Sequence, residues 1–330
     1  MTQAWDFEKP IAELEKKIEG LKKFSLDKKV DLSSEISRLD IKLKTLKREI
    51  YSKLTPWQKI QISRHPNRPT VLDYVNLIMK DFIPLSGDRL YGEDKALICG
   101  LATLDKVNPV RNGISNGVKI ALIGHQKGKD TKENIVRNFG CAHPEGYRKS
   151  MRIMKMAQSF NIPIVCLVDT PGAYPGVGAE ERGQAQAIAE NIRDMFSLKV
   201  PILVIIIGEG GSGGALGIGI GDRVLIMEYA YYSVISPEGC AAILWKDASK
   251  RAEAAKALKL TAGDLLRLGI VDEIIPEVEG GAHRDYETTA ANLKKALVKN
   301  LKDISGLSSQ ELLEQRYQKY RKIGVFNEDE

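Results

Sequence analysis

Residues 202–217 read ILVIIIGEGGSGGALG, and they give the strongest indication of the type of fold. Its six branched apolar residues, followed by Gly208, predict a strand that is buried on both faces. The glycines after it remove nearly every Cβ, so they predict a tight turn in which other groups can approach the backbone closely. A helix is expected to follow this turn. The order strand, glycine-rich turn, helix is typical of an α/β protein whose sheet is covered by helices.

A second stretch repeats this order earlier in the chain. Residues 164–178 read IVCLVDTPGAYPGVG, which predicts a strand over Ile164 to Asp169, a loop containing Gly172 and Gly176, and a helix that starts near Ala179. If the two strands are parallel, both loops leave the sheet at its carboxyl edge, where α/β proteins place their ligands.

The rest of the chain extends this pattern in both directions. Further strands, with helices between them that include 144–160 and 180–196, are predicted at 96–104, 119–124, 223–227, 232–235 and 270–275. Apolar residues at helical spacing predict an antiparallel helical pair within 10–54, and polar helices are predicted at 288–301 and 309–322. We therefore divide the chain into an N-terminal helical hairpin (1–55), a connector (56–94), a core (95–280) and a C-terminal helical arm (281–330). Residues 108–117, which are rich in turn formers, are expected to form a hairpin tip without chemistry.

Composition excludes several classes of protein. With 330 residues, 43% of them hydrophobic, the chain can bury a sizeable core. Its net charge of +6 is mild, and the basic residues are interleaved with acidic ones, so nucleic-acid binding is not predicted. No apolar run approaches the roughly 20 residues that cross a membrane, and no secretory signal is visible. We expect a soluble cytoplasmic protein. Its four scattered cysteines form no C-x-x-C pair, so no metal site is expected in this chain.

Two familiar motifs fail when their chemistry is checked. Asp169-Thr-Pro-Gly172 resembles the metal-side motif of a GTPase, but the preceding Gly124–Asp130 loop has the wrong spacing and ends in Asp where Ser or Thr is needed. Gly208-x-Gly210-x-x-Gly213 matches a dinucleotide fingerprint, but the next strand follows too soon for a crossover helix to span the sheet.

A third motif stays open as the alternative function. Gly210-x-Ser212-x-Gly214 matches the nucleophile elbow of a serine hydrolase, with Asp264 or Asp272 and then His283 downstream in the usual chain order. Against it, a glycine-rich turn satisfies the pattern trivially, and His283 lies in a polar loop.

The backbone itself is the other candidate catalytic group. The first N–H groups of a helix have no partner within the helix, and the positive end of the helix dipole lies behind them. Where glycines leave these groups accessible, they can stabilise a developing oxyanion. The competing interpretation is tight packing of a short helix on the sheet.

Longer motifs support a resemblance to one family. The segments Gly124–Gly128, Asn138–Gly140, Pro144–Lys149, Asp169–Gly183, Gly208–Ala215 and Ser233–Cys240 closely resemble the carboxyltransferase α subunits of bacterial acetyl-CoA carboxylase. The similarity covers essentially the whole chain, from Phe7–Leu14 to Arg316 and Tyr317.

The resemblance implies a crotonase-like (ClpP/crotonase) fold of repeated ββα units. It also implies an enzyme that transfers a carboxyl group from carboxybiotin to acetyl-CoA and forms malonyl-CoA, the first committed step of fatty acid synthesis. The expected partners are a zinc-bearing β subunit, with two copies of each subunit, a biotin carboxyl carrier protein that bears the biotin, and biotin carboxylase. Released biotin can act as the base, so no catalytic histidine is required.

Site residues follow from the same resemblance. The donors that stabilise the biotin-derived enolate fall on Gly213 and Gly214, and Gly210 and Gly211 shape the turn. The second loop, expected to line the biotin side, contributes Gly172, Ala173, Tyr174 and Gly176. Candidate contacts for phosphate or carboxylate groups, with a solvated basic face as the alternative, are Lys127, Lys129, Arg148 and Lys149.

Overall fold

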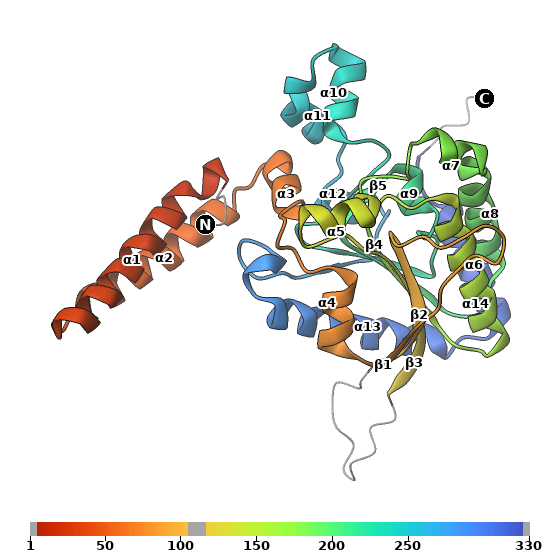
Figure 1. The fold of residues 1–330 in the computed structure, drawn as a ribbon, viewed down its shortest axis with the longest axis horizontal. Coiled ribbons are helices and arrows are strands. Elements are labelled where there is room, and N and C mark those ends of the chain that lie inside the picture. Colours follow the sequence, from red (N-terminus) through yellow and green to blue (C-terminus); the bar gives the residue numbers. More distant parts are fainter. Residues whose placement is uncertain (1–4, 105–116, 326–330) are drawn as a thin grey trace, which may run out of the picture.

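A single mixed sheet forms the centre of the molecule (Figure 1). The computed structural model describes residues 5–104 and 117–325, so the expected hairpin tip at 108–117 lies outside the described residues except for Gly117. The sheet has eight strands in the order β1-β2-β3-β4-β5-β6-β8, and β7 pairs with β5 beside this path. The strands are β1 Met79–Pro84, β2 Leu97–Leu104, β3 Val118–His125, β4 Ile164–Thr170, β5 Ile202–Gly211, β6 Arg223–Met227, β7 Tyr231–Ser233 and β8 Glu273–Ile275.

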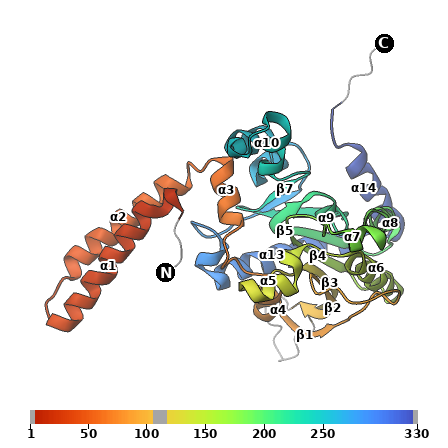
Figure 2. The same ribbon diagram turned by 45° about the horizontal axis from the view of Figure 1, so that its top comes forward.

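The described residues also form fourteen α-helices. They are α1 Lys9–Lys28, α2 Ser33–Tyr51, α3 Pro56–Ser63, α4 Val71–Ile78, α5 Thr131–Val136, α6 Pro144–Ser159, α7 Val177–Glu181, α8 Gln184–Ser197, α9 Ser212–Leu216, α10 Pro237–Trp245, α11 Arg251–Ala257, α12 Ala262–Arg267, α13 Tyr286–Ser305 and α14 Ser309–Arg321. Helices α6 and α8 pack together on one face, whereas α4 and α13 pack together on the other (Figures 1 and 2). The predicted α/β class is therefore confirmed.

The strands from β3 onward run parallel, and β1 and β2 extend the sheet with antiparallel pairs. Strands β4 and β5 are buried along their whole length, as their continuous apolar sequences predicted. Strand β1 was not predicted, because its Lys, Asp and Pro residues are typical of loops. These residues are tolerated here because β1 is an edge strand.

The sequence predicts that strand β5 ends at Gly208. In the structure, β5 continues to Gly211. Its first half pairs with β6 through Leu203 to Ile206, and its last three residues pair with β7 instead. The strand therefore changes partner near Gly208.

Local backbone chemistry explains the other differences from the predicted elements. The helix expected at 180–196 is divided into α7 and α8 by Gly183, which has a φ of 81°. Strand β8 is shorter than the predicted 270–275, since the N–H of Ile270 bonds back to Leu265 in a turn after α12. Helix α3, not predicted, begins with Pro56 and is capped by the Thr55 hydroxyl.

The two ends of the chain differ in how they meet the body. Helices α1 and α2 form the predicted hairpin, which projects from the body in both views (Figures 1 and 2). The predicted C-terminal helices are present as α13 and α14, but they pack on the body, with Leu293 and Leu297 of α13 fully buried in the main core. The segment expected as a C-terminal arm is therefore part of the body, because α13 contributes side chains to the main core.

The four-part division of the chain stays a prediction, but residues 56–94 are more than a connector. Val71 and Tyr74 of α4 belong to the main core, and β1 joins the sheet. Residues 56–94, expected as a connector, therefore contribute to the body, because the apolar face of α4 covers part of the sheet.

Candidate active site at the carboxyl edge of the sheet

The two glycine-rich loops meet at one edge of the sheet. Strands β4 and β5 are parallel, as the sequence reasoning required. A Cβ added to Gly211 would lie 2.1 Å from the carbonyl oxygen of Pro171, and one added to Gly214 would lie 2.4 Å from the backbone nitrogen of Ala173. Only glycine permits this approach, so the loops pack backbone against backbone.

Gly213 differs from its neighbours because its surroundings are open. A Cβ placed there would meet only Ile188 atoms at 3.8 Å, an ordinary contact distance. No side chain caps α9 at Gly211, and the first N–H groups of a helix lack intrahelical partners. Gly213 and Gly214 are the second and third residues of α9, and Gly213 is half-buried whereas Gly214 is buried.

Internal contacts fix the second loop. The Thr170 hydroxyl donates to the Gly172 carbonyl at 2.7 Å and accepts from the Gly172 N–H at 3.1 Å. The Tyr174 ring stacks on His143 with centroids 4.1 Å apart. A Cβ at Gly176 would lie 2.4 Å from that ring, so Gly176 lets the ring lie flat against the loop.

Ser212 is not assembled into a hydrolase triad. Its backbone has a φ of 52°, and its side chain lines an apolar cavity of about 560 Å³. His283 stacks instead on His65 with centroids 3.6 Å apart. Asp264 bonds the Thr261 hydroxyl, while Asp272 accepts from a backbone N–H of β6.

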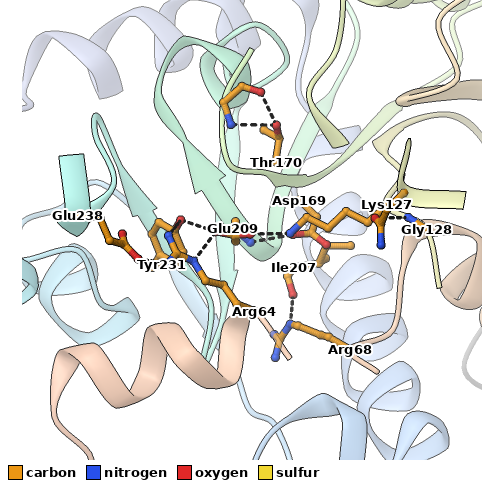
Figure 3. A network of polar contacts seen from close by, with 12 residues as sticks. Arg64, Arg68, Lys127, Gly128, Asp169, Thr170, Ile207, Glu209, Tyr231 and Glu238 are labelled. Atoms are coloured by element: carbon orange, nitrogen blue, oxygen red, sulfur yellow. Dashed lines mark hydrogen bonds and ion pairs between the residues drawn. The ribbon is translucent and has the colours of Figure 1, made fainter. Parts of the chain in front are cut away.

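An ionic cluster lies beneath the loops (Figure 3). The Lys127 ammonium, from the loop after β3, donates to Asp169 at 2.7 Å and to Glu209 at 2.8 Å. Asp169 is near the end of β4, and Glu209 follows the point where β5 changes partner. The same Asp169 oxygen also accepts from the Glu209 N–H at 2.8 Å. One cation thus joins the bases of both loops.

Glu209 is held from its other side by residues outside the loops. Arg64, at the end of α3, donates to its second carboxylate oxygen at 2.7 Å, and the Tyr231 hydroxyl donates at 2.6 Å. Arg64 also donates to Glu238 of α10 at 2.6 Å. Burial alone would raise the pKa of Glu209, but the charges of Lys127 and Arg64 outweigh burial and lower its pKa to about 2. The carboxylate is therefore ionised throughout the physiological range.

A polar cavity of about 320 Å³ adjoins this cluster, lined by Arg64, Lys127, Asp169 and Glu209 among others. Beside it, the buried Arg68 guanidinium donates to the carbonyl oxygen of Ile207 at 2.7 Å (Figure 3). The same guanidinium pairs with Glu277. Arg68 thus holds the backbone of β5 immediately before its change of partner.

The four basic residues expected to contact anions all have acidic partners within this chain. Lys127 is bound as described, Lys129 pairs with Asp73, and Lys149 pairs with Glu93 although its side chain is only 2% exposed. Arg148 pairs with Asp88 at 2.8 Å. A solvated basic face, the alternative interpretation, does not describe Lys149, because its charge is compensated inside the protein.

His125 ends β3 and is fully buried. Burial and the Lys127 charge lower the pKa of His125 to about 3, although a hydrogen bond with the Gly214 backbone acts in the opposite direction. The imidazole is therefore uncharged at neutral pH. In the described parts of the chain, no group of three His, Cys, Asp or Glu side chains could hold a metal ion, and no helix there is long and apolar enough to cross a membrane.

Sequence reasoning missed Arg64, Arg68 and Glu209 as parts of this site. Glu209 did carry a signal, because a carboxylate between an apolar strand and a glycine run must find a cation when it is buried. Arg64 and Arg68 lie in a segment rich in proline, and nothing local in that segment indicates that it folds back onto β5.

The chain matches one family of known proteins along nearly its whole length. Residues 4–324 match the family described as "Acetyl co-enzyme A carboxylase carboxyltransferase-like". The acetyl-coenzyme A carboxylase carboxyl transferase subunit alpha of Halalkalibacterium halodurans is 53% identical over 327 residues, covering 99% of this chain and 97% of that protein. The subunit of the same name from Geobacter metallireducens is 54% identical, covering 98% of each chain.

Solved structures support the fold. Transcarboxylase 12S aligns with a TM-score of 0.54 and 18% identity, covering 80% of this chain and 44% of that one. The β subunit of geranyl-CoA carboxylase from P. aeruginosa aligns with a TM-score of 0.51 and 14% identity, covering 80% of this chain and 45% of that one. This chain thus spans less than half of either structure. The similarity to these structures confirms the predicted crotonase-like fold.

Proposed function

The chain belongs to the acetyl-CoA carboxylase carboxyltransferase family as an α subunit, and we propose that the glycine loops at its carboxyl edge form the part of the site that receives carboxybiotin. The observation that carries the proposal is the open backbone of Gly213 at the first turn of α9, beside a second loop packed directly against Gly211 and Gly214.

These loops have room for the flat ring system of biotin, which a separate protein would carry to the site. Gly172 has no atom within 4 Å of its would-be Cβ, and Gly213 has only Ile188 near it, so both leave room beside the backbone. Biotin, when bound, supplies the carboxyl group that is transferred. Gly172, Ala173, Tyr174 and Gly176 would hold it from the β4 side, and Gly210 and Gly211, expected to shape a turn, end the opposing strand β5.

The chain's own contribution to the reaction is to stabilise negative charge. The N–H groups of Gly213 and Gly214 would donate to the carbonyl oxygen that gains charge as the carboxyl group leaves its carrier. Donors that are fixed before the reaction need no rearrangement when the charge develops, and each is worth roughly 3 kcal/mol of transition-state stabilisation. The packing of Gly214 on Ala173 supplies this fixation, because the backbone there cannot move toward the loop.

The other half of the reaction belongs to a partner in this proposal. A zinc-bearing β subunit would bind acetyl-CoA, a separate carrier protein would deliver biotin, and biotin carboxylase would reload it. The assembly would contain two copies of each carboxyltransferase subunit. Malonyl-CoA, the product, would enter fatty acid synthesis.

The reverse reaction tests the proposal directly. We expect biotin-dependent decarboxylation of malonyl-CoA only when the purified chain is combined with its β partner, because each subunit would supply one oxyanion site. The rate is followed by release of acetyl-CoA, with each subunit alone as the control. A complex that forms but has no activity would contradict the proposal.

Ser212 separates this function from the alternative. We expect Ser212→Ala to keep carboxyl transfer within about threefold of the wild type, because the oxyanion donors are backbone groups that the substitution leaves in place. The same variant would abolish serine hydrolysis, so an esterase screen of the wild type and the variant completes the test. A correctly folded Ser212→Ala complex without transfer activity would count against backbone catalysis.

A further inference from the structure

We propose that Lys127 is a positioning residue for the carboxyl transfer: its ammonium joins the base of one glycine loop to the base of the other and so sets the distance between them. This inference rests on the proposed function. It replaces the expectation that Lys127 contacts an anion, since its ammonium is already bound by two carboxylates of this chain.

The position of Lys127 lets it act on both loops at once. Asp169 is followed directly by Thr170, whose hydroxyl braces Gly172. Glu209 lies four residues before Gly213, in the short segment of β5 that pairs with β7. Because each carboxylate is only a few residues from a glycine loop, a displacement of either carboxylate would also displace the loop next to it.

Close packing makes this connection stiff. A Cβ at Gly208 would lie 2.4 Å from an Asp169 carboxylate oxygen, so Asp169 fills the space above the β5 backbone. A Cβ at Gly140 would lie 3.1 Å from the Lys127 Cγ, so the Lys127 stem is also enclosed. These contacts place the Lys127 stem against Gly140 and the Asp169 carboxylate against the backbone of β5.

Arg64 and Arg68 also bind the segment of β5 from Ile207 to Glu209, at atoms that Lys127 does not contact. Arg64 binds the Glu209 oxygen that does not face Lys127, and Arg68 binds the Ile207 carbonyl. Both oxygens of Glu209 are therefore occupied, and the segment between Ile207 and Glu209 is fixed by three cations (Figure 3). Buried ion pairs add little net stability compared with apolar residues of the same shape, so we assign this one a geometric role.

Lys127→Met tests the role in the complete complex with the β partner. Methionine keeps the length of the stem and removes the charge. We expect kcat for malonyl-CoA decarboxylation to fall about 10- to 100-fold, as small misplacements of catalytic groups do, with KM for malonyl-CoA within about twofold. The matched control is Lys155→Met, which breaks a lysine–aspartate pair of 2.9 Å at the surface, to Asp194, and is expected to keep full activity.

A second variant separates positioning from general stability. Lys127→Met leaves Asp169 and Glu209 without the cation between them, so it lowers the melting temperature as well. Lys127→Met/Asp169→Asn removes one of these negative charges and is expected to regain much of the lost melting temperature while kcat stays low. Lys127→Arg keeps the charge in a wider head group and is expected to recover part of kcat. If kcat returned together with the melting temperature in the double variant, the role would be structural only.

The outcomes also distinguish this inference from the function on which it rests. An inactive wild-type complex would overturn the proposed function itself. An active wild-type complex in which Lys127→Met matches Lys155→Met in kcat would overturn only the positioning role.

Discussion

Gly213→Val is expected to reduce carboxyl transfer by about 100-fold or more while the protein stays folded. A valine Cβ fits at this position, because its nearest neighbours would be Ile188 atoms at 3.8 Å. Side chains in a helix tilt toward its N-terminus, so the two methyl groups would cover the N–H groups that begin α9. Blocking one preorganised donor of this kind typically costs 10²- to 10³-fold in kcat. The measurement is kcat for malonyl-CoA decarboxylation by the complex with the β partner.

The chain contains a matched control for this substitution. Gly263 is the second residue of α12, as Gly213 is of α9, and its would-be Cβ meets nothing closer than Arg267 at 3.7 Å. Gly263→Val therefore imposes the same helix-propensity cost without reaching the loops, and it should keep activity. Gly213→Ala should show a smaller loss than valine. Transfer at the wild-type rate by Gly213→Val would exclude these N–H groups as the oxyanion site.

Arg316→Met is expected to lower the free energy of unfolding by about 3–5 kcal/mol, the usual cost of breaking a buried ion pair from one side. The Arg316 guanidinium is fully buried and pairs with both oxygens of Asp222 at 2.8 and 2.9 Å. It also donates to carbonyl groups at the end of α8, including those of Met195 and Leu198 at 2.7 Å. Without it, the Asp222 carboxylate stays buried with no cation. Urea unfolding of the purified chain measures the change.

Arg321→Met on the same helix is the control for this measurement. Arg321 is exposed, and surface substitutions usually change stability by no more than about 0.5 kcal/mol. Equal stabilities for the two variants would show that Arg316 does not attach α14 to the body.

Much of the candidate site could be predicted because glycine and apolar runs act locally. The apolar runs at 164–168 and 202–207 predict buried strands, and the glycines that follow leave the backbone without side chains. Parallel strands bring such turns to one edge of the sheet, so the meeting of the two loops follows from strand direction alone.

The class of fold, the two strand–loop–helix units and the family can therefore be derived from the order of the residues. The ionic cluster beneath the loops cannot, because it depends on contacts between distant segments. Arg64 and Glu209 are 145 residues apart, and Lys127 and Asp169 are 42 apart. The partner of a charged side chain depends on which distant segments the folded chain brings together. A buried charge requires a partner, but that requirement does not specify which one.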